Sequence, residues 1–328
     1  MNVFVTGGNG FIGANVIRKL VEGKYSVTTL VRKQSNLKFI ESLSIRYCFG
    51  DLLAPETYDN EIKKCDVIFH IAAFNQFWSK DKRNYYNINV NGTKNILELA
   101  WKYKKFLIYT STRGTLGVSN PPEFSDENTQ FNFHTKNDYI MSKYIAEQNV
   151  EDYIKRGLPC IIVSPTAPIG PFDSKPTPTG RVLLDYFNGN VKYYIKGGVN
   201  FVDVEDVALG HILAFQKGKV GEKYILGNEN IELYEFFKKM EFVSRISVPK
   251  IKIPYSIALS ASYFFVFLSK INRHSPLATP QKVSSLFNRY SYCSSKKAIE
   301  ELGFPQTPII ESIKKAHSWF RQNNYIHD

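Results

Sequence analysis

Three spaced glycines between a short β-rich run and a helical pattern constrain this chain more than any other feature. The turn reads Thr6-Gly7-Gly8-Asn9-Gly10-Phe11-Ile12-Gly13 and is followed by apolar residues at helical spacing as far as Glu22. Such glycines let backbone amides approach a pyrophosphate, and the helix amino terminus adds a partial positive charge. An ordinary tight turn would not require three of them. The sequence therefore predicts a dinucleotide site at Gly7, Gly10, Phe11, Ile12 and Gly13.

Strands alternate with helices along the first half of the chain. The expected strands are Asn2 to Thr6, Tyr25 to Val31, Ser44 to Phe49, Asp66 to Ala73, Phe106 to Ser111 and Cys160 to Ser164. Helices are expected over 11–22, 84–103, 138–156 and 207–216. This alternation predicts an α/β fold, a doubly wound parallel sheet of the Rossmann type with a smaller, mostly helical C-terminal substrate-binding region.

The expected domain boundaries follow from a proline-rich, loop-like stretch that begins at Pro165. We expect residues 1–164 and 199–228 to form the dinucleotide-binding domain, with 201–204 and 224–227 returning to the sheet domain. Residues 165–198 and 229–328 are expected to form the substrate-binding cap.

Composition narrows the class of protein. Of 328 residues, 43% are hydrophobic and 22% charged, as in ordinary globular proteins. The net charge of +12 is spread along the chain without a recognised nucleic-acid module, so we expect no nucleic acid partner. Four scattered cysteines indicate neither a metal site nor a disulfide framework, and no secretory leader is recognisable, so we expect a cytoplasmic protein.

The end of the second expected strand bears on cofactor choice. NAD-selective sites place a carboxylate about 20 residues after the glycines, whereas an arginine there accommodates a 2′-phosphate. Here the strand ends Leu30-Val31-Arg32-Lys33, and Lys38 follows. These cations predict NADP(H) as the preferred cofactor, with NAD(H) as the alternative; the competing interpretation is that they are solvated surface charges.

Tyr139 and Lys143 lie four residues apart in a helical pattern, so they share one face. An ammonium one turn from a phenol favours the phenolate and lowers its pKa, which makes the pair a workable acid and base. The spacing alone is common by chance, but this pair opens the helix after the fifth strand. That strand ends Thr110-Ser111-Thr112-Arg113, where one hydroxyl would hydrogen-bond the substrate oxygen.

These motifs together resemble the extended short-chain dehydrogenase/reductase family, also called the epimerase/dehydratase family, over nearly the whole chain. Further matching motifs are Asp51-Leu52, His70-Ile71-Ala72-Ala73, Asn89-Val90-Asn91-Gly92-Thr93 and Pro165-Thr166. Within that family the chain looks most like the dihydroflavonol-reductase-like branch, which includes hopanoid-associated sugar epimerases, and like 3β-hydroxysteroid dehydrogenases. Lys175 to Arg181, Tyr224 to Gly227 and Ser294 to Ala298 carry that likeness.

The resemblance implies a role for each matching residue. Thr112, Tyr139 and Lys143 would be catalytic, with Lys143 also on the nicotinamide ribose. Asp51 and Leu52 would lie at the adenine, and the remaining cofactor contacts would come from Ala72, Ala73, Thr110, Pro165, Thr166 and Ala167. Arg113 stands where the family usually has a small residue, which leaves Ser111 as an alternative to Thr112. The resemblance also implies a homodimer.

Two reactions fit this site. Nucleotide-sugar enzymes of the family commonly carry an arginine just before the segment that here reads Asn200-Phe201-Val202-Asp203-Val204, because a bound diphosphate needs a cationic clamp. This chain has Gly198-Val199-Asn200 there instead of the arginine, although Lys192, Lys196 or Arg181 could replace it. We therefore expect reduction of a ketone, or oxidation of the matching alcohol, on a fairly hydrophobic small molecule. The alternatives are a nucleotide-sugar epimerase or dehydratase with tightly bound NAD, and a regulatory protein without turnover.

Two aromatic groups of residues point to apolar ligands. Phe74, Phe77 and Trp78, with Arg113, are candidate substrate contacts. The segment 253–271 is largely apolar, but serines, a proline and a lysine interrupt it, so it is not expected to span a bilayer. It is interpreted as a buried cap helix, with a substrate lid or a peripheral membrane contact as alternatives.

Overall fold

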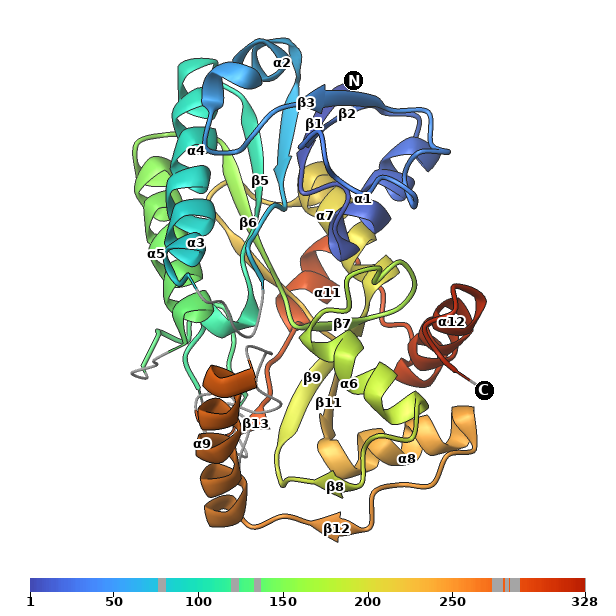
Figure 1. Cartoon of the computed structure of the whole chain (residues 1–328). Helices are drawn as coiled ribbons and strands as arrows, with labels where there is room; N and C mark the ends of the chain where they lie inside the picture. The colour runs from blue at the N-terminus through green and yellow to red at the C-terminus, as the bar shows by residue number, and fades with distance from the viewer. Residues whose placement is uncertain are drawn as a thin grey trace.

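The central feature of the computed structural model is a seven-stranded, fully parallel sheet (Figure 1). Its strands are β1 (Asn2–Thr6), β2 (Ser26–Val31), β3 (Arg46–Phe49), β4 (Val67–His70), β5 (Phe106–Thr110), β6 (Cys160–Pro165) and β10 (Lys223–Leu226). They run in the order β10-β6-β5-β4-β1-β2-β3. The structure describes residues 1–75, 81–118, 124–132, 137–272 and 290–327, together with Pro280 and Val283.

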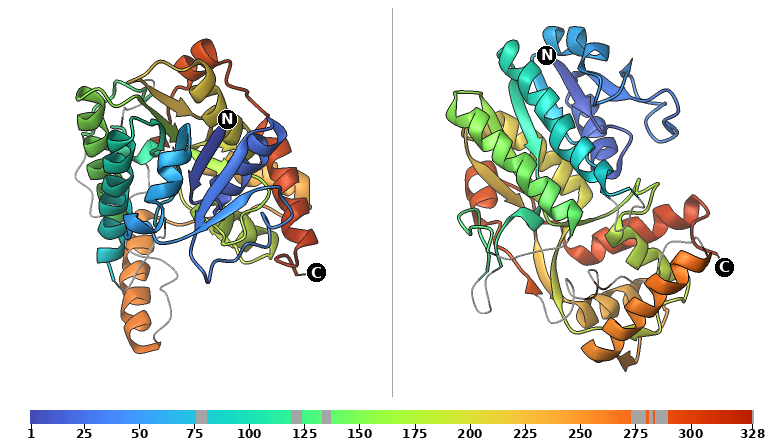
Figure 2. Two further views of the ribbon diagram at one scale, coloured as in Figure 1. Left: turned by 90° about the horizontal axis from the view of Figure 1, so that it is seen from above. Right: turned by 60° about the vertical axis from the view of Figure 1, so that its left-hand side comes forward.

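Helices cover both faces of this sheet because every central strand is apolar on both sides. Val3 and Val5 point into one core, and Phe4 between them points into the other. The first core is closed by α1 (Phe11–Glu22), α7 (Val204–Lys217) and α11 (Lys296–Leu302). The second is closed by α2 (Asp59–Lys64), α4 (Gly92–Lys102) and α5 (Asp138–Lys155), which lie side by side in Figure 2.

The strand order reverses between β1 and β4. The chain proceeds from β1 outward to β2 and β3, then returns to β4 and continues through β5 and β6 to β10. In doubly wound sheets ligands bind at the carboxyl ends of the strands beside such a reversal. The glycine-rich turn follows β1 directly, so this topology places it at that point.

A second, smaller sheet lies beside the carboxyl edge of the first. It contains β7 (Ala167–Ile169), β9 (Gly198–Asp203), β11 (Glu229–Glu232) and β13 (Tyr290–Ser291). Three helices pack on it around a core of their own, namely α6 (Pro178–Phe187), α8 (Leu233–Ser244) and α12 (Ile309–Gln322). The short strands β8 (Tyr193–Tyr194) and β12 (Ile251–Lys252) pair with each other, and α9 (Tyr255–Asn272) projects from the body (Figures 1 and 2).

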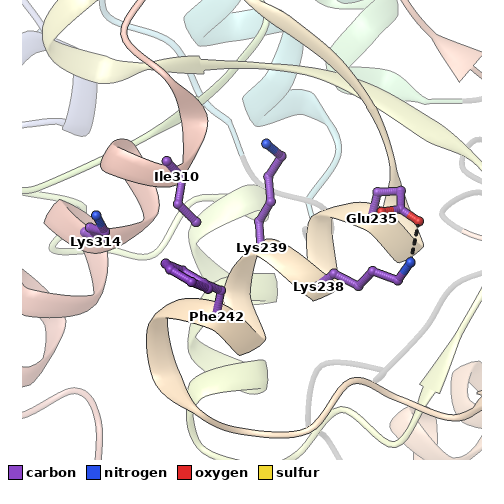
Figure 3. A pocket seen from close by; sticks show the side chains of 6 residues that line it. All are labelled: Glu235, Lys238, Lys239, Phe242, Ile310 and Lys314. Carbon is purple, nitrogen blue, oxygen red and sulfur yellow. Dashed lines mark hydrogen bonds and ion pairs between the residues drawn. The ribbon is translucent and has the colours of Figure 1, made fainter.

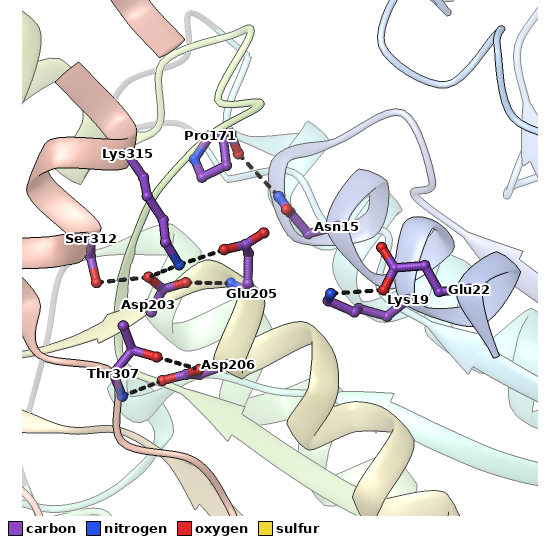
Figure 4. Close-up of polar contacts among 10 residues, drawn as sticks. All are labelled: Asn15, Lys19, Glu22, Pro171, Asp203, Glu205, Asp206, Thr307, Ser312 and Lys315. Carbon is purple, nitrogen blue, oxygen red and sulfur yellow. Dashed lines mark hydrogen bonds and ion pairs between the residues drawn. The ribbon is translucent and has the colours of Figure 1, made fainter. Parts of the chain in front are cut away.

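Acidic side chains at the start of α7 tie the two parts together (Figure 4). The fully buried Asp203 caps α7 by accepting from the Glu205 amide at 2.8 Å, and it also accepts from Ser312 at 2.9 Å and Lys315 at 3.1 Å of α12. Asp206 accepts from both the amide and the hydroxyl of Thr307. The helix that follows the small sheet is thus anchored to the C-terminal segment.

Some elements differ from those expected. The strand expected at 201–204 does not join the main sheet, because β9 pairs with β7, β11 and β13 instead. The helix expected over 84–103 comprises α3 (Arg83–Tyr86), one π-helical stretch over Asn87–Asn91, and α4. The expected domain boundaries themselves stay a prediction.

Candidate active site

The glycine-rich turn is held in a conformation that side chains would prevent. Gly7 has φ +75°, and a Cβ there would lie 2.7 Å from the backbone of Ala72, which follows β4. A Cβ on Gly13 would lie 2.1 Å from the Gly7 carbonyl oxygen. Gly10 is exposed and caps α1 without a side chain, so the first-turn amides are open to a ligand. This cradle fits the pyrophosphate of a dinucleotide.

Tyr139 lies in the first turn of α5, at the carboxyl edge of the main sheet. The helix begins there because Asn137 accepts hydrogen bonds from the amides of Tyr139 and Ile140, at 3.0 and 3.3 Å. Burial raises the pKa of Tyr139 to about 12, and a side-chain hydrogen bond with Thr112 acts in the opposite direction. The sequence suggested the reverse, a pKa lowered by Lys143.

Lys143 explains that difference. Its ammonium donates to the hydroxyl of Tyr109 at 2.8 Å and to the carbonyl oxygen of Thr110 at 2.7 Å, rather than to Tyr139. The side chain is 2% exposed, and burial lowers its pKa to about 7, with the charge of Glu147 acting against that shift. Lys143 is therefore held at the end of β5, and near neutral pH its amine can be either charged or neutral.

Glu147, one further turn along α5, fixes the hydroxyl of Ser111. This buried carboxylate accepts from Ser111, from Thr115 at 2.8 Å, and from Lys223 of β10. The Ser111 hydroxyl is thus turned into the core. Thr112, in contrast, is only partly buried and bonded to Tyr139. The geometry favours Thr112 over Ser111 as the hydroxyl that meets a substrate.

Thr110 points to the opposite side of the sheet. Its hydroxyl lies 2.9 Å from Nε2 of His211 in α7, and Nδ1 of that histidine lies 2.7 Å from the Val207 carbonyl oxygen. The carbonyl oxygen accepts from Nδ1, so Nε2 accepts from Thr110. Thr110 therefore contributes its backbone carbonyl to the site, through Lys143, rather than its hydroxyl.

A chain of buried hydrogen bonds joins the glycine-rich turn to α5. His70 lies between Thr6, at 2.7 Å, and Thr93, at 2.9 Å, and burial lowers its pKa to about 3. Thr93 donates to the Asn89 carbonyl oxygen at 2.7 Å, and the Asn89 amide donates to Ser142 at 2.9 Å. The last hydrogen bond of this series is donated by Ser142 to the carbonyl oxygen of Tyr139, at 2.8 Å.

Several residues of this arrangement were not predicted as site residues, namely Tyr109, Glu147, Asn89, Ser142 and His70. The sequence did hold one signal for Glu147, because 139, 143 and 147 repeat every four residues and so line one face of a helix. Asn89 sits in the π-helical stretch, a local distortion common at functional sites.

The predicted 2′-phosphate contacts lie at the carboxyl edge of the main sheet. Thr6 of β1 is in register with Leu30 of β2, so Arg32 follows β2 level with the glycine-rich turn. Arg32, Lys33 and Lys38 are all exposed. Within the part of the chain that is described, Arg32 and Lys33 form no ion pair, and the Arg32 amide donates to Ser35 at 3.2 Å.

The other predicted cofactor residues flank the same edge. Asp51 is exposed and accepts from the Leu53 amide at 2.9 Å, while Leu52 is buried against Gly92. Ala72 donates its amide to Thr6 at 3.2 Å, and Ala73 is exposed. On the far side of β5, Pro165 ends β6, Thr166 donates its amide to Leu226 at 3.1 Å, and Ala167 begins β7.

The predicted substrate residues Phe74 and Arg113 lie in different surroundings. Phe74 packs edge-on against Tyr85, with ring centroids 4.9 Å apart. Arg113 is 7% exposed and donates to Ser125 at 3.2 Å and to the carbonyl oxygens of Gly117 and Tyr292 at 3.4 Å. Arg113 therefore joins the end of β5 to the C-terminal segment. Phe77 and Trp78 lie outside the described residues.

A surface hollow between α8 and α12 does not belong to this site (Figure 3). Three lysines line it, but each has an acidic partner. Lys238 pairs with Glu235 at 2.9 Å, Lys239 with Glu229 at 3.2 Å and Lys314 with Glu311 at 2.8 Å. Because these cations are neutralised locally, the hollow is not a built anion site.

The fold and the site define an NAD(P)-dependent oxidoreductase of the short-chain dehydrogenase/reductase type. The chain belongs to the NAD-dependent epimerase/dehydratase family, whose model matches residues 3–227. It is 36% identical to a putative dihydroflavonol 4-reductase from Synechocystis sp., over 98% of this chain and 95% of that protein. It is 28% identical to sterol demethylase protein B from Methylococcus capsulatus, over 99% and 100% of the two chains. The crystal structure of gox2253 superposes with a TM-score of 0.87 at 35% identity, covering 99% of both chains.

Proposed function

We propose that this protein is an NADP(H)-dependent reductase that converts a ketone on a fairly hydrophobic small molecule to the secondary alcohol, or catalyses the reverse oxidation. The nicotinamide, when bound, supplies or accepts the hydride. The chain's own groups handle the oxygen and its proton. The observation that carries the proposal is the pairing of Thr112 with Tyr139 beside the glycine-rich cradle.

The protonation states suit reduction. With a pKa raised to about 12, Tyr139 keeps its proton at neutral pH and is ready to donate it to an oxygen that gains negative charge. Thr112 holds that oxygen against the phenol. Lys143, fixed by Tyr109 and Thr110, would bind the nicotinamide ribose. In its protonated form Lys143 would also supply positive charge near the phenol of Tyr139.

The preference for NADP(H) rests on Arg32 and Lys33. Both are exposed cations directly after β2, level with the glycine-rich turn, and no carboxylate stands where a ribose-binding acid is usual. The hydroxyl of Ser35 lies beside the Arg32 amide and would add a neutral donor to a phosphate.

The preference for an apolar substrate over a nucleotide sugar is supported by Asn200. This residue is 1% exposed, and its side chain bonds to Asn228, Asn230 and the carbonyl oxygen of Cys293. It is thus a structural residue and cannot clamp a diphosphate. The similarity to a dihydroflavonol 4-reductase and to a sterol demethylase protein supports a bulky, apolar ketone.

The reaction is tested by mixing the purified protein with NADPH or NADH and separate pools of apolar ketones and nucleotide sugars. We expect the absorbance of reduced nicotinamide to fall with a ketone and to stay constant in the Tyr139→Phe variant. Conversion of a nucleotide sugar without net consumption of cofactor would instead establish the epimerase alternative. Cofactor binding without turnover across both pools would indicate a regulatory protein.

Cofactor choice is tested by Arg32→Ala. Loss of one charge-assisted contact of about 1.5–3 kcal/mol should raise the KM for NADPH relative to NADH by roughly 10- to 100-fold. Arg46→Ala is the matched control, because Arg46 is an exposed arginine at the opposite end of the neighbouring strand β3. An unchanged ratio in Arg32→Ala would remove the NADP(H) preference.

A further inference from the structure

Helix α9 exposes a continuous apolar face. Ile257, Tyr263, Phe264 and Phe267 are 59, 62, 58 and 60% exposed. At about 100° per residue, these four side chains and Ser260 fall within an arc of about 120°. Ser262, on the other side of the helix, is fully buried. In the left view of Figure 2 this helix extends away from the rest of the molecule.

The stretch of sequence that contains α9 is strongly basic. From Phe242 to Ile299 the sequence contains nine Lys and Arg residues and no Asp or Glu, so these 58 residues carry +9 of the net charge of +12. Lys250 and Lys252, just before α9, are exposed on either side of Ile251, which is itself 56% exposed. Lys250 and Lys252 thus stand directly before the apolar helix, with Glu232 lining the same hollow as Lys252. Lys296 and Lys297 of the same stretch lie in α11 and pair with Glu300 and Glu222, so they do not add to this surface.

The paired strands β8 and β12 extend this surface. Ile251 is in register with Tyr193, and the Ile253 amide donates to the Tyr194 carbonyl oxygen at 2.9 Å, which fixes the segment before α9 to strand β8. Tyr193 is 52% exposed. Aromatic rings with a polar tip, such as tyrosine, suit the boundary between water and lipid headgroups.

From these features we infer that α9, with the β8 and β12 pair, is a docking surface for an anionic phospholipid bilayer. Amphipathic helices with aromatic side chains and flanking lysines lie in the bilayer interface, and each nearby cation is attracted to anionic headgroups. The protein would lie on the membrane rather than cross it. An 18-residue helix is about 27 Å long, short of a hydrocarbon core of about 30 Å, and no helix within the described ranges meets the criteria for a membrane span.

Charge also argues against a second copy of the chain as the occupant. A two-fold interface places the same patch on both partners, so the basic run would face itself. An anionic bilayer, in contrast, complements the cations and accepts the aromatic rings together. This inference does not depend on which ketone the enzyme reduces.

The test is co-sedimentation of the full chain with vesicles of phosphatidylcholine, alone or mixed with phosphatidylserine. We expect binding to the anionic vesicles only, weakened by added salt. The double variant Phe264→Ser with Phe267→Ser should bind at least about tenfold more weakly, because it removes two aromatic anchors. Trp101→Ser is the matched control, since Trp101 is a 44% exposed aromatic residue on α4, and it should bind like wild type.

Three results would overturn the inference. One is absence of binding to anionic vesicles by the wild type. Another is equal binding by the double variant with an unchanged melting temperature. The third is a wild-type dimer in sedimentation equilibrium that the double variant converts to a monomer, which would make a second copy the occupant. If the double variant does not fold, Lys250→Glu with Lys252→Glu replaces it, and that variant should lose binding to anionic vesicles.

Discussion

Removing the buried carboxylate of Glu147 should destabilise the protein much more than removing the partly buried carboxylate of its neighbour Glu151. Both residues lie on α5 and both pair with Lys223 of β10, but their surroundings differ. Glu147 has 2% of its side chain exposed and also accepts from Ser111 and Thr115. Glu151 lies 3.6 Å from Lys223, and 34% of its side chain is exposed. Within the described part of the chain, its only further side-chain bond is the one it accepts from Gln148.

The size of the effect follows from burial. Lys223 is 17% exposed, so Glu147→Ala leaves a largely buried cation with only its weaker partner. Breaking a buried pair costs about 3–5 kcal/mol, and two hydroxyls lose their acceptor in addition. Glu151→Ala should cost about 0–1 kcal/mol. Glu147→Gln keeps an acceptor for the hydroxyls but loses the charge, so it should fall between the two.

The assay is urea unfolding of the three variants, followed by circular dichroism and analysed for the free energy of unfolding. We expect the order Glu151→Ala, Glu147→Gln, Glu147→Ala in increasing loss of stability. If Glu147→Ala costs no more than Glu151→Ala, the buried network does not hold β5, β10 and α5 together, and the reasoning from burial is wrong.

Two more predictions concern the residues that follow β5 and those that precede α6. Thr112→Ala should lower kcat by about 10²–10³-fold while Ser111→Ala retains turnover, because only Thr112 meets Tyr139; steady-state kinetics that show the opposite pattern would reverse the assignment. Burial raises the pKa of Asp173, which accepts from Thr177, to about 7. Folded Asp173 thus binds a proton that the unfolded chain has released, so its contribution to stability falls as the pH rises from about 4 to about 7. Asp173→Asn should make the fall of the free energy of unfolding with pH less steep, by up to about 1.4 kcal/mol per pH unit. The measurement is urea unfolding of both proteins at several pH values between about 4 and 7; an equal change of unfolding free energy with pH in the two proteins would contradict the expectation.

Local patterns were sufficient for much of the fold. Strand and helix periodicity predicted every strand of the main sheet approximately, because buried parallel strands are short apolar runs and their covering helices are amphipathic. Strand β9 could not be assigned in this way. Its apolar residues suit either sheet, and its partners β7, β11 and β13 are distant in sequence, so only the packing of the whole chain decided the pairing.

The sequence by itself determined the dinucleotide turn and the tyrosine and lysine four residues apart, since both depend on short-range geometry. Only the tertiary structure decided what these groups do electrostatically. Lys143 meets Tyr109 and Thr110 instead of Tyr139, because the end of β5 lies under α5 and offers acceptors in a buried environment. The same packing turns Ser111 toward Glu147 and leaves Thr112 free for Tyr139. Burial and hydrogen-bond direction arise from contacts between distant segments, and no local spacing encodes them.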